Sequence, residues 1–322
     1  MMFNAAFRTL FLSTPVRLSL LDRHLCIAQK DKESVKIPLS DILCIILESP
    51  QITLTNALLN ALAQYKIVCY TCDSSHLPSG VFMPFLGHFK SLSILQNQIK
   101  LKKQTKAVLW QQMVKAKISN QAALLQMCSK AEWYQLESLA KSVNLGDSTN
   151  NEAKAAAIYF KALFGVGFSR KIQIFEEEKI GTINAALNYG YAIVRGIIVR
   201  SLCASGLNPA LGINHKNQFN AFNLADDMIE PYRIFVDSLV MRMCENGELQ
   251  ESLSLENRVQ LVEILNVSVM IEKKLYPLSR AVIVSVQSLV RCLEVENLKL
   301  KTPLFCEEKS NGREIYEGVS NV

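Results

Sequence analysis

One twenty-residue stretch of the chain concentrates side chains that bind divalent cations. Residues 214–233, NHKNQFNAFNLADDMIEPYR, place His215 shortly before Asp226, Asp227 and Glu230. One imidazole combined with carboxylates suits Mn²⁺ or Mg²⁺ better than structural zinc, which usually takes thiolates as well. The competing interpretation is an amphipathic helix with an acidic, solvated face, which is common in soluble proteins. Periodicity alone leaves both open and favours the solvated face.

The three acids would crowd together on one side of a helix over residues 224–237. Asp226 and Glu230 are four residues apart and Asp227 and Glu230 three apart, so their side chains are neighbours and repel by about 0.2–0.5 kcal/mol. Pro231 removes a helical hydrogen bond beside them and predicts a bend or break. Crowded carboxylates at a bend are reasonable if a cation sits among them.

Glu152 is a further carboxylate with two possible roles. In a helix over GDSTNNEAKAAAIYFKALFG its neighbours are small or apolar, and a carboxylate packed there is costly unless a metal ion or donor compensates it. However, Thr149-x-x-Glu152 is also a capping box, in which the glutamate reaches back to the first amide of the helix. Spacing does not separate a capping glutamate from a catalytic one, so both roles remain open.

A basic cluster follows the first third of the chain, close to Trp110. It could track a phosphate backbone, or it could be the solvated face of an ordinary helix, and the sequence favours neither. Its members are Lys100, Lys102, Lys103, Lys106, Lys115 and Lys117.

The elements that must position these residues fall into two parts of the chain, which differ in the spacing of their hydrophobic residues. Up to about residue 85, short β-branched or alternating runs predict strands, interrupted by one helical pattern in TNALLNALAQY; HLPSGVFMP is predicted to be a turn or irregular loop. From about residue 91 the apolar residues recur every three or four positions, including in SLENRVQLVEILNVSVMIEKK. We therefore expect an α+β protein. A small, mostly β, sandwich-like domain with one helix (residues 1–88) should precede a larger all-α domain (residues 89–322), with a mobile polar tail over the last twenty or so residues.

Composition sets the broad class. The 322 residues are 49% hydrophobic and 20% charged, which suits about two folded domains, and a net charge of +6 permits nucleic acid as a partner without requiring it. No run approaches the roughly 18 uncharged residues of a membrane-spanning helix. The first residues lack the basic leader of a signal peptide, so we expect a cytoplasmic protein with no membrane association.

The cysteines favour a structural role. There are nine, mostly in apolar contexts. Cys69 and Cys72 have C-x-x-C spacing, but zinc would need a second such pair and a redox motif would normally open a helix. We interpret this pair as structural.

Four motifs together resemble a known family. They are NEAKAAAIYFKALFG, INAALNYGYAIVR, the block GLNPALGINHKNQFNAFNLADDMIEPYRIFVD, and ITLTNALLNALAQYKIVCYTCDSSHLPSG in the β half. The combination resembles the CRISPR-associated adaptation integrase, an endonuclease family often called "Cas-one", in a form seen with type II systems. The resemblance runs from about residue 8 to residue 303.

The resemblance implies roles for particular residues. Glu152, His215 and Glu230 match the family's metal-binding catalytic residues, which hold Mg²⁺ or Mn²⁺. Some relatives have Asp where this chain has Glu230. Asp227 would bind a second ion or orient His215 from behind. Asp226 falls where many relatives are uncharged, so it is excluded from the site.

The same resemblance implies an activity and partners. The protein would insert prespacer DNA into a CRISPR array, a 3′-hydroxyl attacking a phosphodiester at the border of a repeat, and would cleave DNA when water replaces that hydroxyl. Its partners would be double-stranded DNA, a second copy of itself through the β domain, and a small ferredoxin-fold CRISPR adaptation protein. Two alternatives are a catalytically idle DNA-binding or assembly scaffold on the same fold, and a helical interaction module whose acids are merely solvated.

Overall fold

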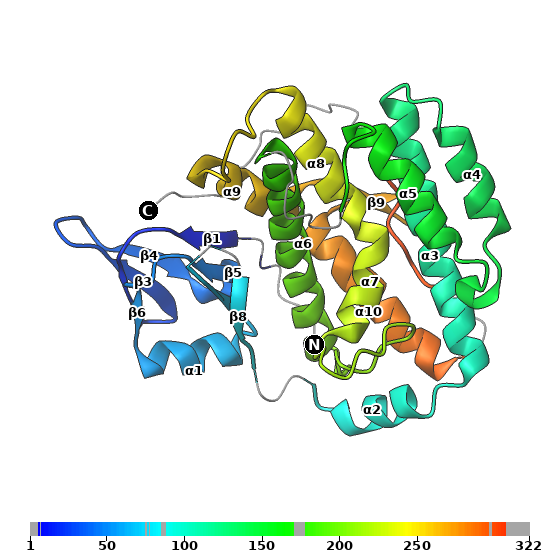
Figure 1. The fold of residues 1–322 in the computed structure, drawn as a ribbon. Helices are drawn as coiled ribbons and strands as arrows, with labels where there is room; N and C mark the ends of the chain where they lie inside the picture. Colours follow the sequence, from blue (N-terminus) through cyan, green and yellow to red (C-terminus); the bar gives the residue numbers. More distant parts are fainter. Residues whose placement is uncertain are drawn as a thin grey trace. The chain divides into compact units, whose positions relative to one another are not determined.

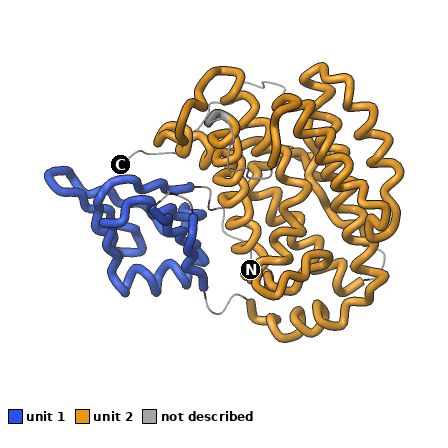
Figure 2. The backbone as a smooth tube through the Cα atoms, viewed as in Figure 1, with its two compact units in different colours: residues 1–87, 310–322 blue, residues 88–309 orange. Residues whose placement is uncertain are grey.

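The chain folds into two compact units that meet in sequence between residues 87 and 88 (Figure 2). The computed structural model describes residues 6, 8–74, 76, 78–84, 88–170, 178–295 and 298–306. The unit boundary falls one residue before the predicted one. The expected mobile tail lies almost entirely outside the described residues, and its mobility stays a prediction.

The smaller unit contains two four-stranded sheets. The first has the order β1-β5-β7-β8, with β1 (Arg8–Leu12), β5 (Ile42–Leu47) and β7 (Val68–Cys72) parallel and β8 (Pro78–Phe82) antiparallel. The second has the order β4-β3-β2-β6. Its strands are β2 (Arg17–Leu21), β3 (His24–Ala28), β4 (Val35–Pro38) and β6 (Thr53–Leu54). A 3₁₀ turn, η1 (Leu39–Asp41), precedes β5.

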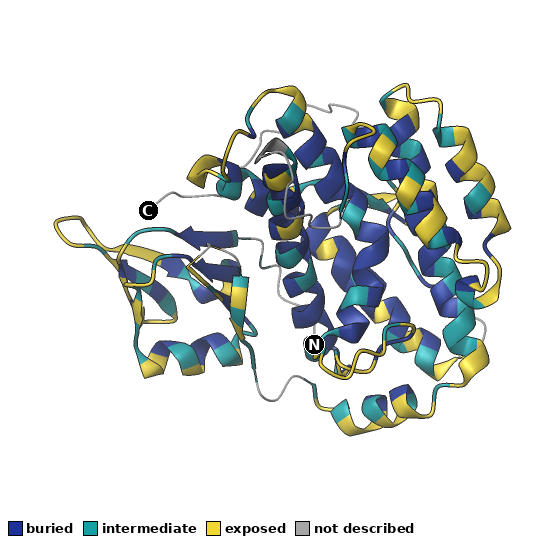
Figure 3. Cartoon of the chain, viewed as in Figure 1, coloured by how far each residue is buried: buried dark blue, intermediate teal, exposed yellow. Residues whose placement is uncertain are grey.

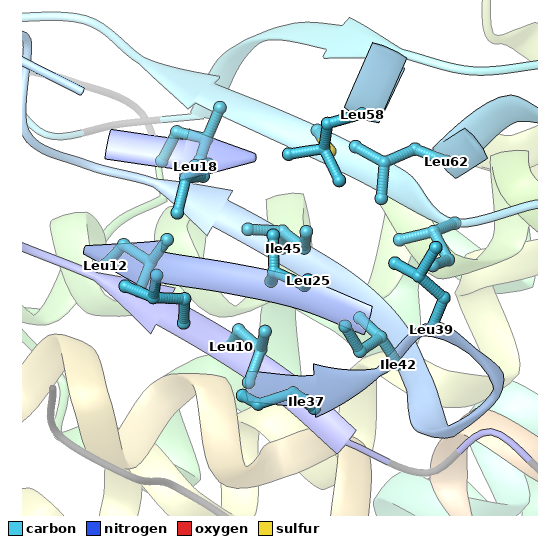
Figure 4. Packing of buried hydrophobic residues seen from close by; sticks show 14 of the residues in the cluster. Leu10, Leu12, Leu18, Leu25, Ile37, Leu39, Ile42, Ile45, Leu58 and Leu62 are labelled. Carbon is cyan, nitrogen blue, oxygen red and sulfur yellow. The ribbon is translucent and has the colours of Figure 1, made fainter. Parts of the chain in front are cut away.

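The core of this unit is aliphatic. Leu18, Leu25 and Ile45 are fully buried, and Leu58 from helix α1 (Asn56–Gln64) packs with them (Figure 4). Thr55 caps α1 by accepting a hydrogen bond from the Leu58 amide. The predicted β domain with a single crossing helix is therefore found in the structure.

The segment predicted as a loop around residue 80 is a strand instead. Pro78 begins β8, which is an edge strand, and proline is tolerated at the first residue of such a strand. Gly80 lies so close to the side chain of Thr71 that a Cβ would collide with it. The Pro–Gly signal therefore marked a sheet edge, because both residues are compatible with an edge strand as well as with a turn.

The larger unit is mostly helical (Figure 1). Its long helices are α2 (Ser91–Ile99), α3 (Lys103–Met127), α4 (Trp133–Ser142), α5 (Asn151–Phe164), α6 (Glu178–Ala204), α8 (Arg233–Glu245) and α10 (Leu278–Glu294). Shorter helices are α7 (Asn223–Ile229) and α9 (Leu255–Val262), with 3₁₀ turns η2 (Leu145–Asp147), η3 (Glu230–Tyr232) and η4 (Glu263–Asn266). Together with the β unit, this confirms the predicted fold class.

One part of this unit departs from the helical prediction. A hairpin of β9 (Ser268–Ile271) and β10 (Lys274–Pro277) interrupts it, so the domain is not helical throughout. The turn residues Glu272 and Lys273 both have positive φ, which ends any helix, and the run of Val and Ile before them favours a strand. Apolar spacing alone does not tell such a short run from a helix.

Two helices organise the region around the candidate site. Helix α6 packs against α7, α8 and α10 and is largely buried, while α3 packs against α4, α5, α7, α8 and η3 (Figures 1 and 3). Gly190 of α6 faces Val236 of α8 so closely that a Cβ would clash with the valine side chain. This glycine, inside the motif INAALNYGYAIVR, is therefore what lets the two helices approach.

Candidate active site

The first turn of α5 presents Glu152. Asp147 caps this helix, because its two carboxylate oxygens accept hydrogen bonds from the amides of Asn151 (2.9 Å) and Glu152 (3.0 Å). The side chain of Thr149 contacts Asn151 instead of capping. The capping-box interpretation of Glu152 is therefore wrong, and its carboxylate is available for another contact.

Glu230 lies where α7 gives way to η3. Pro231 follows it directly, and the α-helix stops at Ile229 as the sequence predicted, with η3 leading into α8. Glu230 is only 4% exposed, although it carries a charge. The break thus turns one carboxylate into the protein interior, away from the solvated face that periodicity favoured.

Lys117 of α3 joins these two carboxylates. Its Nζ donates a hydrogen bond to Oε1 of Glu152 at 2.7 Å and lies 2.6 Å from Oε2 of Glu230. On its other side, Glu230 accepts a hydrogen bond through Oε1 from Nε of Arg233 at 2.9 Å. Two carboxylates that are far apart in sequence therefore converge on one ammonium group.

His215 is oriented by Asp227. Its Nδ1 lies 2.7 Å from Oδ1 of Asp227, and that carboxylate also accepts hydrogen bonds from the backbone amides of Ile213, Asn214 and His215. Asp227 is fully buried, and the ring of Trp110 packs edge-on against the imidazole. With Nδ1 engaged, a ligand would be bound through Nε2 of the same ring.

Asp226 has a separate environment. It accepts a hydrogen bond from Nδ2 of Asn220 at 2.6 Å and lies 3.6 Å from Arg195. The guanidinium of Arg195 also stacks near the ring of Phe222. Asp226 therefore anchors the loop between His215 and α7, and its exclusion from the candidate site stays a prediction.

The electrostatics keep the buried Glu230 carboxylate charged. Burial raises the pKa of Glu230, but Arg233 and Lys117 outweigh it and lower that pKa to about 2. Burial lowers the pKa of Lys117, but Glu230 and Glu152 together hold it above its usual value. The hydrogen bond with Asp227 raises the pKa of His215 against the effect of burial.

A second buried network supports the same helices. Asp237 of α8 accepts hydrogen bonds from the hydroxyls of Tyr159 (3.0 Å) and Tyr191, and the Arg233 guanidinium lies 4.5 Å from the Tyr191 ring centroid. Burial raises the pKa of Asp237 to about 6, although both tyrosines oppose that rise. Arg233 therefore connects this network to Glu230.

The chemical types of the candidate ligands suit a divalent ion better than their present positions do. Among the described residues, no three His, Cys, Asp or Glu side chains are grouped closely enough to hold a metal ion. Yet Oε2 of Glu230 is buried and lies against a cation, Nζ of Lys117, at 2.6 Å. Hard carboxylate oxygens with one imidazole suit Mg²⁺ or Mn²⁺. The residues thus fit such an ion once Lys117 gives way.

The C-x-x-C pair has no such geometry. Cys69 and Cys72 lie on β7, three residues apart and so on opposite faces of the strand, and no disulfide joins them. Burial raises the pKa of the Cys69 thiol to about 12, which makes it unreactive.

Comparison with known families decides the identity. The family model described as "CRISPR associated protein Cas1" matches residues 10–263. The chain belongs to this family. The resemblance of the four sequence motifs to this family is thereby confirmed, and with it the function class of a CRISPR adaptation integrase and endonuclease. The form seen with type II systems stays a prediction.

A curated relative and two solved structures match this Cas1-family chain over nearly its whole length. It is 37% identical to the CRISPR-associated endonuclease Cas1 of Neisseria meningitidis serogroup C over 298 residues, 92% of this chain and 95% of the relative. Among solved structures, a "Casposase bound to integration product" superposes with a TM-score of 0.76 at 17% identity, covering 97% of this chain and 98% of that one. A Cas1 protein from Thermotoga maritima superposes with a TM-score of 0.71 at 15% identity, covering 94% and 100%. These structures share the fold.

Three residues near the site were missed or misplaced by sequence reasoning. Lys117 was counted among the solvated or DNA-binding lysines, but it is buried. Asn120, one turn further on, donates from Nδ2 to the carbonyls of Pro231 (3.0 Å) and Pro303 (3.1 Å). Arg233 was noted only as part of the motif. A signal was present: Lys117 and Asn120 recur at the three-residue spacing of the apolar side chains, which places them on an inward face.

No helix among the described residues is long and apolar enough to cross a membrane.

Proposed function

We propose that this Cas1-family protein is a divalent-cation-dependent DNA integrase whose ion is held by Glu152, His215 and Glu230. The observation that carries the proposal is the convergence of Glu152 and Glu230 on one cationic group, Nζ of Lys117. Two buried or half-buried carboxylates at this separation need a cation between them. Mg²⁺ or Mn²⁺ would be that cation in the active protein.

The reaction exchanges one phosphodiester bond for another. The 3′-hydroxyl oxygen of prespacer DNA attacks a phosphorus atom at a repeat border, a new P–O bond forms, and the bond to the departing 3′-oxygen breaks. Water in place of the attacking hydroxyl gives strand cleavage instead. When bound, the divalent ion supplies Lewis-acid stabilisation of the charge that develops on the phosphate oxygens.

The protein's own residues hold the ligands in place. Asp227 fixes the tautomer and orientation of His215 through Nδ1, so its proposed role is to orient the imidazole and not to bind the ion itself. Arg233 immobilises Glu230 through Oε1, and Asp147 fixes the turn that carries Glu152. Each ligand is therefore supported by a second charged side chain, which reduces the motion that ion binding must suppress.

Partners follow from the family and the solved relatives. One solved structure with this fold is the "Casposase bound to integration product". Another is a "Cas6-RT-Cas1--Cas2 complex", which superposes with a TM-score of 0.68 at 18% identity over 92% of this chain and 37% of that one. By analogy, we propose that this chain binds double-stranded prespacer and repeat DNA, forms a homodimer through its β domain, and assembles with a small ferredoxin-fold CRISPR adaptation protein. The exposed lysines before Trp110 are candidates for phosphate contacts; they are Lys100, Lys102 and Lys103.

The test is a strand-transfer assay. Labelled duplex with free 3′ ends is incubated with a repeat-containing plasmid, the small partner and Mn²⁺ or Mg²⁺, and wild type is compared with Glu152→Gln, His215→Ala and Glu230→Gln. Glu137→Gln is the matched control, since Glu137 pairs with Lys141 on the surface. We expect transfer by wild type and the control, and none by the other three or after chelation.

The outcomes separate the alternatives. Absence of transfer and cleavage by wild type with either ion would overturn the integrase proposal. DNA binding and assembly without chemistry would favour the idle scaffold. Activity in the three variants equal to wild type would show that the ion is held elsewhere.

A further inference from the structure

Lys117 occupies an unusual place for a lysine. It lies in the middle of the 25-residue helix α3, and its side chain is only 10% exposed. It is also the only lysine of the basic cluster that contacts both Glu152 and Glu230 in the described part of the chain. A lysine buried in this way does not contact a DNA backbone and does not belong to a solvated helix face.

The contacts of Glu230 limit where a divalent ion could bind. Oε1 is taken by Nε of Arg233 at 2.9 Å, which leaves Oε2 as the oxygen available to an ion. Oε2 is the atom that lies 2.6 Å from Nζ of Lys117. On the other side of the ammonium, Oε1 of Glu152 is 2.7 Å away. An ion bridging Glu152 and Glu230 would therefore share the oxygen of Glu230 that Lys117 already contacts.

An ammonium and a dication are poor neighbours at this distance. Mg²⁺, for example, binds oxygen ligands at about 2.0–2.1 Å. With Nζ only 2.6 Å from the same oxygen, the two cations would stand within a few ångströms of each other in a largely buried site, where salt screens them little. One of the two cations must withdraw for the other to bind.

We propose that Lys117 is an internal cation that takes the place of the divalent ion between Glu152 and Glu230 in the metal-free protein and competes with that ion for the site. Lys117 is thus a positioning residue: it holds the two carboxylates together without metal, and its displacement is part of ion binding. This inference rests on the proposed metal site and adds the residue that sets the site's affinity.

The test measures ion binding directly. Mn²⁺ is titrated by calorimetry into wild type, Lys117→Met and Lys117→Arg, and thermal unfolding is followed in chelator and in Mn²⁺. Lys115→Met is the matched control, because it removes a partly exposed lysine from the same helix. His215→Ala shows whether the ion measured is the one at this site.

The expected results are opposite to those of a structural ion pair. Lys117→Met should bind Mn²⁺ at least about tenfold more tightly than wild type, a change of the size seen when groups around metal ligands are replaced. In chelator it should unfold at a lower temperature, since two carboxylates lose their counter-ion, and Mn²⁺ should raise its Tm more than that of wild type. Lys117→Arg and Lys115→Met should bind no more tightly than wild type.

Each failure has a distinct signature. If wild type binds Mn²⁺, His215→Ala weakens that binding and Lys117→Met binds no more tightly than wild type, the competition is refuted while the metal site stands. If neither wild type nor any variant binds Mn²⁺, the proposed metal site fails as well. Should Lys117→Met be unfolded in chelator, Mn²⁺ must restore its helical circular dichroism, and lack of recovery overturns the inference.

Discussion

One oxygen of Asp227 holds His215 at two points. Oδ1 accepts the His215 backbone amide at 3.1 Å and lies 2.7 Å from the ring Nδ1 of the same residue. Both the loop backbone and the imidazole orientation therefore depend on one buried carboxylate. Gly212 permits this approach, because a Cβ there would collide with the His215 carbonyl.

Asp227→Asn should remove activity and stability together. An amide that turns Nδ2 toward the loop leaves buried N–H donors unpaired, so we expect a loss of about 2–4 kcal/mol in the free energy of unfolding. Urea denaturation measures this loss, and the strand-transfer assay should show no product. The control is Asp226→Asn on the same turn, which should cost less than about 1 kcal/mol because its ion pair is partly exposed. Equal losses in both variants would contradict the role given to Asp227.

Asp237 should make stability depend on pH with an unusual sign. Burial raises its pKa from 3.8 to about 6, so between these values the folded protein binds this proton more tightly than the unfolded chain. Its contribution to stability therefore falls as pH rises from 4 to 6, by about 3 kcal/mol for a shift of about two pH units, and is constant above. The lowered pKa of Glu230 acts below pH 4.5, which overlaps only the lower end of that range, and the raised pKa of His215 acts above pH 6.5.

The comparison with Asp237→Asn isolates this contribution. Urea denaturation of both proteins at several pH values between 4 and 6 gives the difference in unfolding free energy, from which the other carboxylates cancel. We expect the wild type to lose stability relative to the variant as pH rises. A difference that is flat, or of opposite slope, would show that Asp237 stays ionised across the range.

Gly190→Ala should separate α6 from α8. The added methyl group meets the Val236 side chain, so we expect a loss of about 1–3 kcal/mol in unfolding free energy. Adding Val236→Ala should cost less in this background than in wild type, because the smaller side chain makes room. Gly181→Ala, where a Cβ meets nothing within 4 Å, is the control and should not destabilise. Additive losses in the double variant would argue against direct contact.

Asn120→Ala should release the segment after α10. The Asn120 side chain donates to the carbonyls of Pro231 and Pro303, and its Oδ1 accepts the Phe305 amide at 3.0 Å. Removing it leaves these buried groups unpaired, at a cost of about 2–4 kcal/mol. Hydrogen exchange at the Phe305 amide should accelerate far more than in Ser119→Ala, which changes an exposed neighbour. Unchanged exchange would mean that packing alone holds the segment.

Much of the fold was predictable because it depends on local periodicity. Alternating β-branched residues before residue 85 and three-to-four spacing after residue 91 reflect which faces are buried, and burial dominates stability. The break at Pro231 was equally predictable, since proline removes a specific helical hydrogen bond. The hairpin at residues 268–277 was not predictable, because its strands are too short for their hydrophobic period to be distinguished from that of a helix.

The sequence by itself determined the family, the order of the two domains and the chemical types of the candidate ligands, since these depend on residue identity and spacing along the chain. Spacing also placed Asp226, Asp227 and Glu230 close together on one helix without ranking them. Only the tertiary structure assigned them different environments: one to Arg195, one to His215, one to Lys117 and Arg233. It likewise gave the capping of α5 to Asp147 and left Glu152 for the site. The physical reason is that helical geometry sets which side chains are neighbours on one element, whereas the groups that face them come from segments far away in the chain.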